Sequence, residues 1–163
     1  MSLKAYDRIQ STIGNADFKR AANELVRFAE NRKRLPNCSI RLPNYLFATA
    51  PGCGVSTHLR MFADLLAELG LIRPSGSVSC FEWVLDEEAF RPNGGFDRLL
   101  DAISRFSGVN ESFRGVIGVD VSAWQSHPDK HLDRLILLAD DLQSEADTVF
   151  VYVVDLKEMD KNT

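Results

Sequence analysis

Residues 45–57 read YLFATAPGCGVST, and this stretch decides how the chain is expected to fold. Its first part is apolar and has the length of a β-strand. Two glycines one residue apart, Gly52 and Gly54, predict a turn, and an amphipathic helical pattern follows from Ser56 to Leu69. The stretch is therefore predicted to form a strand, a glycine-containing loop and a helix, in that order.

The same alternation continues along the rest of the chain. Short apolar runs are separated by helical patterns, which predicts right-handed crossovers and a parallel sheet covered by helices on both faces. The last run is almost entirely apolar, as expected for a central strand buried on both sides. The fold class is thus α/β, a three-layer α/β/α sandwich. The predicted strands are 45–50, 78–84, 115–121 and 148–154, and the predicted helices between them are 56–69, 95–106 and 128–144.

The chain of 163 residues has the length of a single domain, and no internal repeat or linker divides it. An amphipathic helix is predicted from Asp17 to about Leu35, with Asn15 or Asp17 as its cap and Pro36 as its end. Residues 1–12 are expected to be disordered. Residues 13–35 then form a leading helical segment before an α/β core at 45–159.

Composition and charge exclude several classes of protein. The chain is 45% hydrophobic and 26% charged, as in soluble globular proteins. Nineteen Lys and Arg against 23 Asp and Glu, without a concentrated basic stretch, predict no nucleic-acid partner. No run approaches the ~18–20 apolar residues of a membrane span, and the start lacks a signal peptide, so we expect no membrane partner and a cytoplasmic location. Three cysteines without a CxxC pair predict reduced thiols.

The loop after the first strand has the chemistry of an anion site. Ligands of parallel sheets bind beyond the carboxyl ends of the strands, and glycines before a helix let backbone N–H groups converge on a phosphate. Against the phosphate-loop pattern G-x-x-x-x-G-K-[ST], Gly54 and Ser56 fit, but Thr49 replaces the first glycine and Val55 replaces the lysine. Because that lysine offsets phosphate charge, valine predicts weakened binding rather than normal hydrolysis. The candidate binding residues are Pro51, Gly52, Cys53, Gly54, Val55, Ser56 and Thr57.

Two further interpretations of the loop remain open. Ser56 is a candidate Mg²⁺ ligand, since a hydroxyl at this position of a phosphate loop binds the metal. Alternatively, the loop is a plain strand-to-helix turn that binds nothing, because two glycines are common in such turns.

Segments on both sides of the loop resemble, in the right order, the AAA+ ATPases, in particular the branch of red-type rubisco activase and stage V sporulation protein K. Residues 13–19, IGNADFK, are similar to the leading IGL-x-x-VK segment of that branch. Residues 45–54 resemble its h-x-F-x-G-x-P-G-T-G loop, and residues 63–72, ADLLAELGLI, its helix end hA-x-hh-x-x-LGhh. The similarity spans about residues 13–159. It implies a P-loop NTPase-like fold with strand order 1-4-3-2, ATP or ADP with Mg²⁺ as ligand, and assembly into rings.

The resemblance also implies losses. Asp120 takes the place of the aspartate that organises the Mg²⁺ shell, which makes it the second candidate metal ligand, but Val121 replaces the glutamate that polarises the attacking water. In the family, an arginine finger, a fifth strand and a helical lid follow, and we expect them to be absent because the sequence stops at Thr163. The strand at 45–50 would then be an edge strand with unpaired backbone groups. Either the sequence is part of a longer chain, or another segment or a partner covers that edge.

Together these features predict a degenerate AAA+ ATPase-like domain without catalytic residues of its own. It is expected to bind ATP or ADP weakly, to hydrolyse little or none of it, and to act as a noncatalytic member of a homo- or hetero-oligomer or with a protein client. One alternative is a protein-interaction module that has lost nucleotide binding. The other is an active ATPase completed by a neighbouring subunit, by a C-terminal region or by basic residues such as Lys33, Arg34 and Arg41.

The remaining residues with chemical potential give weaker signals. Cys53 lies near a helix N-terminus, but the C-x5-R spacing of a cysteine phosphatase is not met. His127 and His131 are four residues apart without an H-E-x-x-H pattern, so zinc is not predicted. Trp83 and Trp124 lie near strand ends, where packing is a more common role than lining a nucleotide or partner site.

Overall fold

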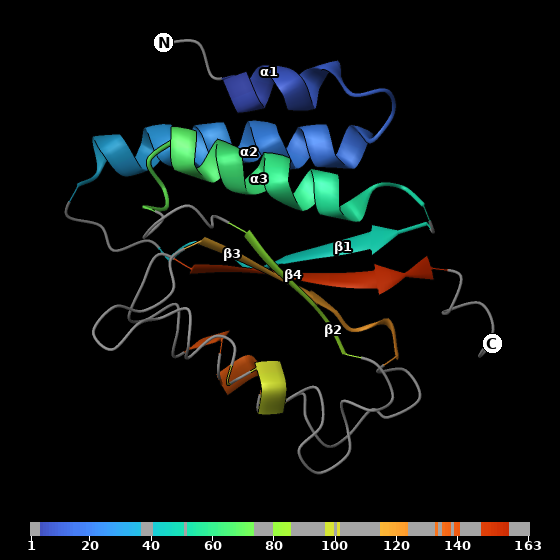
Figure 1. Ribbon diagram of the computed structural model, residues 1–163. Coiled ribbons are helices and arrows are strands. Elements are labelled where there is room, and N and C mark those ends of the chain that lie inside the picture. The colour runs from blue at the N-terminus through green and yellow to red at the C-terminus, as the bar shows by residue number, and fades with distance from the viewer. Residues whose placement is uncertain are drawn as a thin grey trace.

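Four parallel strands pair into one sheet in the order β1-β4-β3-β2 (Figure 1). The central strands β3 and β4 are almost wholly buried, whereas the edge strands β1 and β2 alternate between half-buried and exposed residues. This sheet confirms the predicted α/β fold and strand order. The strands are β1 (Tyr45–Thr49), β2 (Cys80–Val84), β3 (Gly115–Asp120) and β4 (Thr148–Asp155).

The structure is a computed structural model of residues 1–163. The described residues are 4–36, 41–50, 52–73, 80–85, 97–99, 101, 115–123, 133, 135–137, 139–140 and 148–156.

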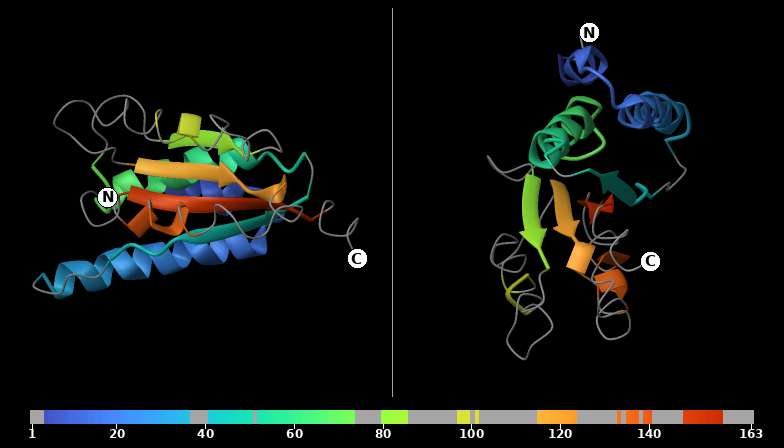
Figure 2. Two further views of the ribbon diagram at one scale, coloured as in Figure 1. Left: turned by 90° about the horizontal axis from the view of Figure 1, so that it is seen from below. Right: turned by 90° about the vertical axis from the view of Figure 1, so that its right-hand side faces the viewer.

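Three helices cover one face of the sheet (Figures 1 and 2). Helices α2 (Ala16–Arg34) and α3 (Val55–Glu68) lie against the sheet, and α1 (Lys4–Ser11) lies outside them. Phe62 of α3 is completely buried in this layer. Its ring meets Tyr45 and Phe47 of β1 at centroid distances of 4.8 and 5.8 Å. The core between the sheet and α3 is therefore largely aromatic beside the first strand.

A second apolar cluster covers the other face. The described residues within 97–101 and 133–140 are helical, and they lie on the side of the sheet opposite α3 (Figure 1). The rest of the helices predicted at 95–106 and 128–144 lies outside the described residues. The buried members of the cluster are Leu85, Leu99, Ile117, Val119, Leu135, Ala139 and Phe150.

The expectation of disorder for residues 1–12 does not hold for residues 4–11, which form helix α1. Ala5 and Ile9, four residues apart, are fully buried in the same core as α2 and α3. The Ala5 N–H donates to Glu68 Oε2 at 2.9 Å, and Arg8 pairs with Asp64 at 2.5 Å. An eight-residue helix is marginal alone, so these tertiary contacts stabilise it.

The leading helix α2 forms within one residue of its predicted bounds. Its apolar side, with Ala22, Leu25 and Ala29 buried, faces the core, and basic residues occupy its last turn. In the described part of the chain, no helix combines the length and the apolar character needed to cross a membrane.

Candidate functional site

The loop between β1 and α3 is a tight turn built on two glycines. Gly52 and Gly54 have left-handed φ angles of 76° and 74°, which other residues rarely adopt. The Cys53 N–H donates to the Ala50 C=O at 3.2 Å and closes the turn. Helix α3 then begins at Val55, and no side chain of its N-cap residue Gly54 caps it. The N–H groups of the first turn of a helix have no partner within the helix. In general, the N-terminus of a helix is a place where anions can bind.

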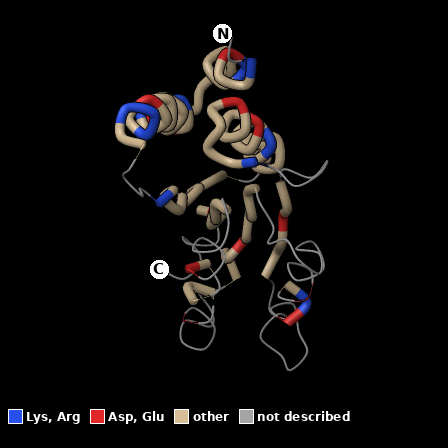
Figure 3. Tube along the Cα trace, turned by 90° about the vertical axis from the view of Figure 1, so that its left-hand side faces the viewer, with Lys and Arg blue, Asp and Glu red and all other residues tan. Residues whose placement is uncertain are grey.

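A pocket of about 270 Å³, here called the acidic pocket, lies between this loop and the carboxyl ends of β2, β3 and β4. Three carboxylates line it, and they are the only charged residues of the four strands (Figure 3). Among the described lining residues there is no Lys or Arg. The sheet thus gathers negative charge at the carboxyl ends of its strands, beside the glycine loop. The pocket residues used below are Gly52, Val55 and Ser56 from the loop and α3, and Glu82, Asp120 and Asp155 from the strands.

One of these carboxylates contacts the loop directly. The Ser56 hydroxyl donates a hydrogen bond to Glu82 Oε2 at 2.6 Å. Because Ser56 is the second residue of α3, the Glu82 carboxylate lies near the positive end of the helix dipole. None of the ion pairs among the described residues includes Glu82. Sequence reasoning assigned no role to Glu82, although it is the one charged residue in the strand CFEWV.

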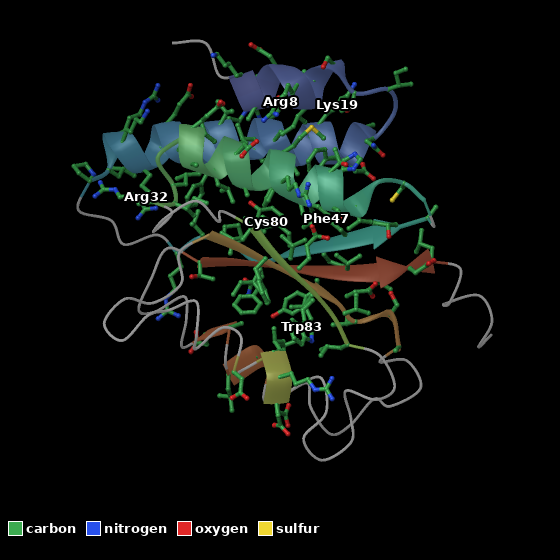
Figure 4. The ribbon with its side chains drawn as sticks, viewed as in Figure 1. Arg8, Lys19, Arg32, Phe47, Cys80 and Trp83 are labelled. Atoms are coloured by element: carbon green, nitrogen blue, oxygen red, sulfur yellow. The ribbon has the colours of Figure 1, made fainter. Side chains whose placement is uncertain are left out.

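The charge of Glu82 also affects the thiol two residues before it. Burial is the main cause that raises the pKa of Cys80 to about 12, and the Glu82 carboxylate is the next. The Arg60 guanidinium acts in the opposite direction. The Cys80 thiol is therefore protonated at neutral pH and is no nucleophile there. Figure 4 shows Cys80 and Phe47 on the α3 side of the sheet and Trp83 on the opposite side.

Asp120, the candidate metal ligand at the end of β3, has one oxygen engaged within the chain. Its Oδ1 accepts hydrogen bonds from the Ser122 N–H at 2.9 Å and from the Ser122 hydroxyl at 2.6 Å. The same hydroxyl accepts from the Asp155 N–H at 2.8 Å, which joins the ends of β3 and β4. Val121 packs against the apolar cluster of the other face and does not line the acidic pocket.

A second pocket of about 460 Å³, here called the apolar pocket, lies on the other side of the loop, between the start of α2 and the free edge of β1. The rings of Phe18 and His58 meet edge to face in its wall, with centroids 4.9 Å apart. His58 Nε2 accepts from Asn15 Nδ2 at 2.7 Å, and Nδ1 donates to the Gly54 C=O at 2.9 Å. His58 therefore links the start of α2 to the glycine loop.

Asn15 lies at the N-cap position of α2, one of the two positions predicted for the cap. Asn15 precedes the helix with a left-handed φ of 53°, and its side chain makes no cap hydrogen bond. The amide instead donates to His58, which is brought close by the packing of α2 beside α3. Sequence reasoning assigned no binding role to Asn15, Phe18 or His58, because their proximity depends on this tertiary packing.

The structure divides the predicted loop residues between the two pockets. Val55, at the position of the missing lysine, lines both. Gly54 and Thr57 line neither, and Pro51 lies outside the described residues. The acidic pocket includes Gly52, Val55 and Ser56, and the apolar pocket includes Cys53 and Val55.

The basic residues considered for a completed ATPase site do not line either pocket. Arg41 pairs with Asp140 at 2.8 Å, and Lys33 and Arg34 lie in the last turn of α2, away from the end that lines the apolar pocket. Trp83 lines the acidic pocket and its ring stacks on that of Phe81 at 5.7 Å. His127 and His131, for which zinc was not predicted, and Trp124 lie outside the described residues.

The donor set suits Mg²⁺ in chemistry but does not form a complete cage. Ser56 and Asp120 supply the hard oxygens that Mg²⁺ prefers. However, the Ser56 hydroxyl is bonded to Glu82, and Asp120 Oδ1 is bonded to Ser122. Within the described ranges, no group of three or more His, Cys, Asp or Glu side chains is placed to hold a metal ion. These residues fit a Mg²⁺ that takes one or two protein ligands and the rest from a nucleotide.

A comparison with known protein families finds none that matches the sequence, and a comparison with curated proteins also finds no match.

Proposed function

We propose that this chain is a degenerate AAA+ ATPase-like domain that binds ATP or ADP weakly, together with Mg²⁺, and does not hydrolyse it. The observation that carries the proposal is the glycine loop. Its two left-handed glycines lead into an uncapped helix at the carboxyl ends of parallel strands. The loop amides are thereby able to donate to phosphate oxygens.

The two pockets suit different parts of a nucleotide. The apolar pocket, with the rings of Phe18 and His58 in its wall, has the character of a site for a flat base. The acidic pocket adjoins the loop amides, where the phosphates would lie. A bound Mg²⁺ supplies the positive charge there that Val55 does not supply, with Ser56 and Asp120 as its protein ligands. The three carboxylates oppose a phosphate that carries no metal, and this is the reason for weak binding.

Hydrolysis is not expected, because the residues that stabilise phosphoryl transfer are missing. Val55 leaves the phosphates without a fixed cation, and no described Lys or Arg lines the acidic pocket. Val121 packs in the apolar cluster, and its side chain cannot act as a general base that activates a water molecule. We place the domain in the cytoplasm as a noncatalytic member of an oligomer or a partner of a protein client.

Thermal unfolding with and without Mg-ATP tests the binding part of the proposal. Nucleotide at tenfold its Kd stabilises the native state by about 1.4 kcal/mol, which raises Tm by roughly 3–6 °C for a domain of this size. Phosphate release should stay at the level of buffer. No Tm shift at millimolar Mg-ATP would contradict the proposal, and release well above buffer would contradict the absence of hydrolysis.

Restoring the missing charge tests the geometry of the loop. Val55→Lys should tighten Mg-ATP binding by ~10-fold or more, because one ammonium is added next to the phosphates. Val55→Met is the matched control, since it adds length without charge and should leave the affinity within about twofold of the original. Equal gains from both variants would show that the loop does not direct residue 55 at phosphate.

A protein-interaction module is the second candidate, and a specific feature of the sheet favours it. β1 is an edge strand of the sheet that the described residues form, and the Leu46 side chain on it is 66% exposed. Free edges with apolar side chains pair readily with other chains. This function would be supported if Mg-ATP bound to neither the natural chain nor Val55→Lys while both remained folded.

A further inference from the structure

Glu82 places a carboxylate beside the first turn of α3, next to the glycine loop. Its Oε2 accepts the Ser56 hydroxyl hydrogen at 2.6 Å, at the uncapped end of α3. A carboxylate at a helix N-terminus interacts favourably with the helix dipole, as a phosphate does. The chain thus satisfies part of its own anion site with a side chain from β2.

The register of the sheet explains why Glu82 faces this site. β2 pairs in parallel with β3, and Glu82 lies opposite Gly118, which has no side chain. Both residues line the acidic pocket together with Leu59 of α3. The alternation of β2 places Phe81 and Trp83 against the apolar cluster of the other face. Glu82 is therefore directed to the α3 side, toward the first turn of that helix.

We infer that Glu82 sets the anion affinity and the metal requirement of the glycine loop. A polyphosphate that approaches the loop is repelled by the Glu82 carboxylate, which is bonded to Ser56. The polyphosphate has either to displace this carboxylate or to bring a cation that neutralises its charge. Metal-free ATP is therefore bound far more weakly than Mg-ATP. This inference rests on the proposed nucleotide binding and concerns the form of nucleotide that the site accepts.

The inference also predicts that a substitution of Glu82 changes two properties in opposite directions: it lowers the stability of the free protein and raises its affinity for metal-free ATP. A residue with a purely structural role would lower stability without raising affinity. The contact of Glu82 with Ser56 stabilises the free protein, whereas the bound nucleotide replaces it. Glu82→Gln keeps a hydrogen-bond acceptor and removes the charge. This variant should unfold at a slightly lower temperature than the natural chain without ligand, and should bind metal-free ATP more tightly.

The experiment compares the Kd of ATP in EDTA and in excess Mg²⁺ for the natural chain, Glu82→Gln and Asp155→Asn. For Glu82→Gln we expect the Kd of metal-free ATP to fall by at least ~10-fold and the difference between the two conditions to shrink. Asp155→Asn is the matched comparison, because it removes one charge from the same pocket but keeps the contact between Glu82 and Ser56. It should lower the Kd of metal-free ATP by clearly less than Glu82→Gln does, about threefold at most. Glu82→Ala, at an exposed position, provides a second variant with the same expected direction.

The outcomes separate this inference from the proposed function. If the natural chain and Glu82→Gln bind metal-free ATP equally, Glu82 does not control the site, while nucleotide binding stands. Equal gains in Glu82→Gln and Asp155→Asn would also overturn the inference, because overall pocket charge would then explain the effect. If none of the variants binds ATP in either condition, the proposed function fails and the inference fails with it.

Discussion

The two pockets beside the glycine loop share Thr49, Ala50 and Val55, but their other lining residues differ in chemistry. The apolar pocket lies between α2 and β1 and rests on the aromatic core of the molecule. The acidic pocket lies at the ends of the strands and contains three carboxylates. One side therefore provides shape and apolar surface, and the other provides charge of the wrong sign for a free phosphate.

This difference shows that the backbone geometry of the loop and the charge pattern around it are separate properties. The loop glycines, the parallel sheet and the helix start are determined by packing and backbone conformation. The charges in the pocket come from single residues at strand ends, namely Glu82, Asp120 and Asp155. Substitutions at such positions change ligand preference while the sheet and helices stay in place.

The largest effect is expected from breaking the aromatic support of the apolar pocket. Phe62 is fully buried beneath Tyr45 and Phe47, so Phe62→Ala should lower the free energy of unfolding by about 3–5 kcal/mol. Urea unfolding followed by circular dichroism measures the change. Leu46→Ala, at the neighbouring position of β1, is the control, because its exposed side chain points away from the aromatic cluster and its loss should cost under ~0.5 kcal/mol. Similar losses for both variants would show that the aromatic cluster does not support this pocket.

The floor of the acidic pocket should respond to added volume. A Cβ at Gly118 would lie 2.6 Å from Leu59 Cδ1, and Leu59 is buried. Gly118→Ala is therefore expected to destabilise the fold by about 1–3 kcal/mol through overpacking. The double variant with Leu59→Ala tests the cause, because removing the leucine makes room for the new methyl group. The double variant should therefore lose less free energy of unfolding than the sum of the losses of the two single variants. Strict additivity in urea unfolding would contradict a direct clash.

High pH should lower the free energy of unfolding through two groups, the Cys80 thiol and the Tyr45 hydroxyl. The pKa of Cys80 is raised from 9.0 to about 12 by burial and then by Glu82, and that of Tyr45 from 10.0 to about 12 by burial and then by Glu24. The folded state thus holds both protons more tightly than the unfolded state. Their contribution is complete below pH 9 and is lost as the pH rises toward 12, with an effect on the order of 1 kcal/mol because both groups are partly exposed.

Two variants assign this alkaline loss to its sources. Cys80→Ala should remove the part that begins near pH 9, and Tyr45→Phe the part that begins near pH 10. Unfolding free energies at pH 8, 9.5 and 11 provide the measurement. If both variants lose stability with pH as steeply as the natural chain, other groups cause the alkaline loss.

The sheet could be predicted from the sequence because its signals are local. Apolar runs of strand length and helical patterns between them indicate parallel crossovers, and two glycines mark the turn before α3. The strand order came from the resemblance to AAA+ ATPases, and the pairing of strands confirms it. Helix α1 was not predicted, because Ala5 and Ile9 are too few apolar residues to form a pattern, and the helix depends on contacts with α2 and α3.

Candidate site residues could be predicted from the sequence only where they belong to a motif whose positions are close together in the chain or lie in a known order. Ser56 was singled out by its place in the phosphate-loop pattern and Asp120 by the resemblance to AAA+ ATPases, and both line the acidic pocket. Glu82 and His58 were missed for a physical reason. Glu82 contacts Ser56 across 26 positions in sequence, through the register of β2 on β3. His58 reaches Asn15 across 43 positions, through the packing of α2 beside α3.

The smallest effect is expected at the link between the apolar pocket and the loop. Asn15 has a left-handed φ of 53°, and its amide donates to His58. Asn15→Gly loses the hydrogen bond but relieves the backbone, so the free energy of unfolding should change by less than ~0.5 kcal/mol. Asn15→Ala loses the hydrogen bond and keeps the unfavourable conformation, so it should cost about 1 kcal/mol. Equal losses for both variants in urea unfolding would mean that the amide contact, and not the backbone conformation, decides stability at this junction.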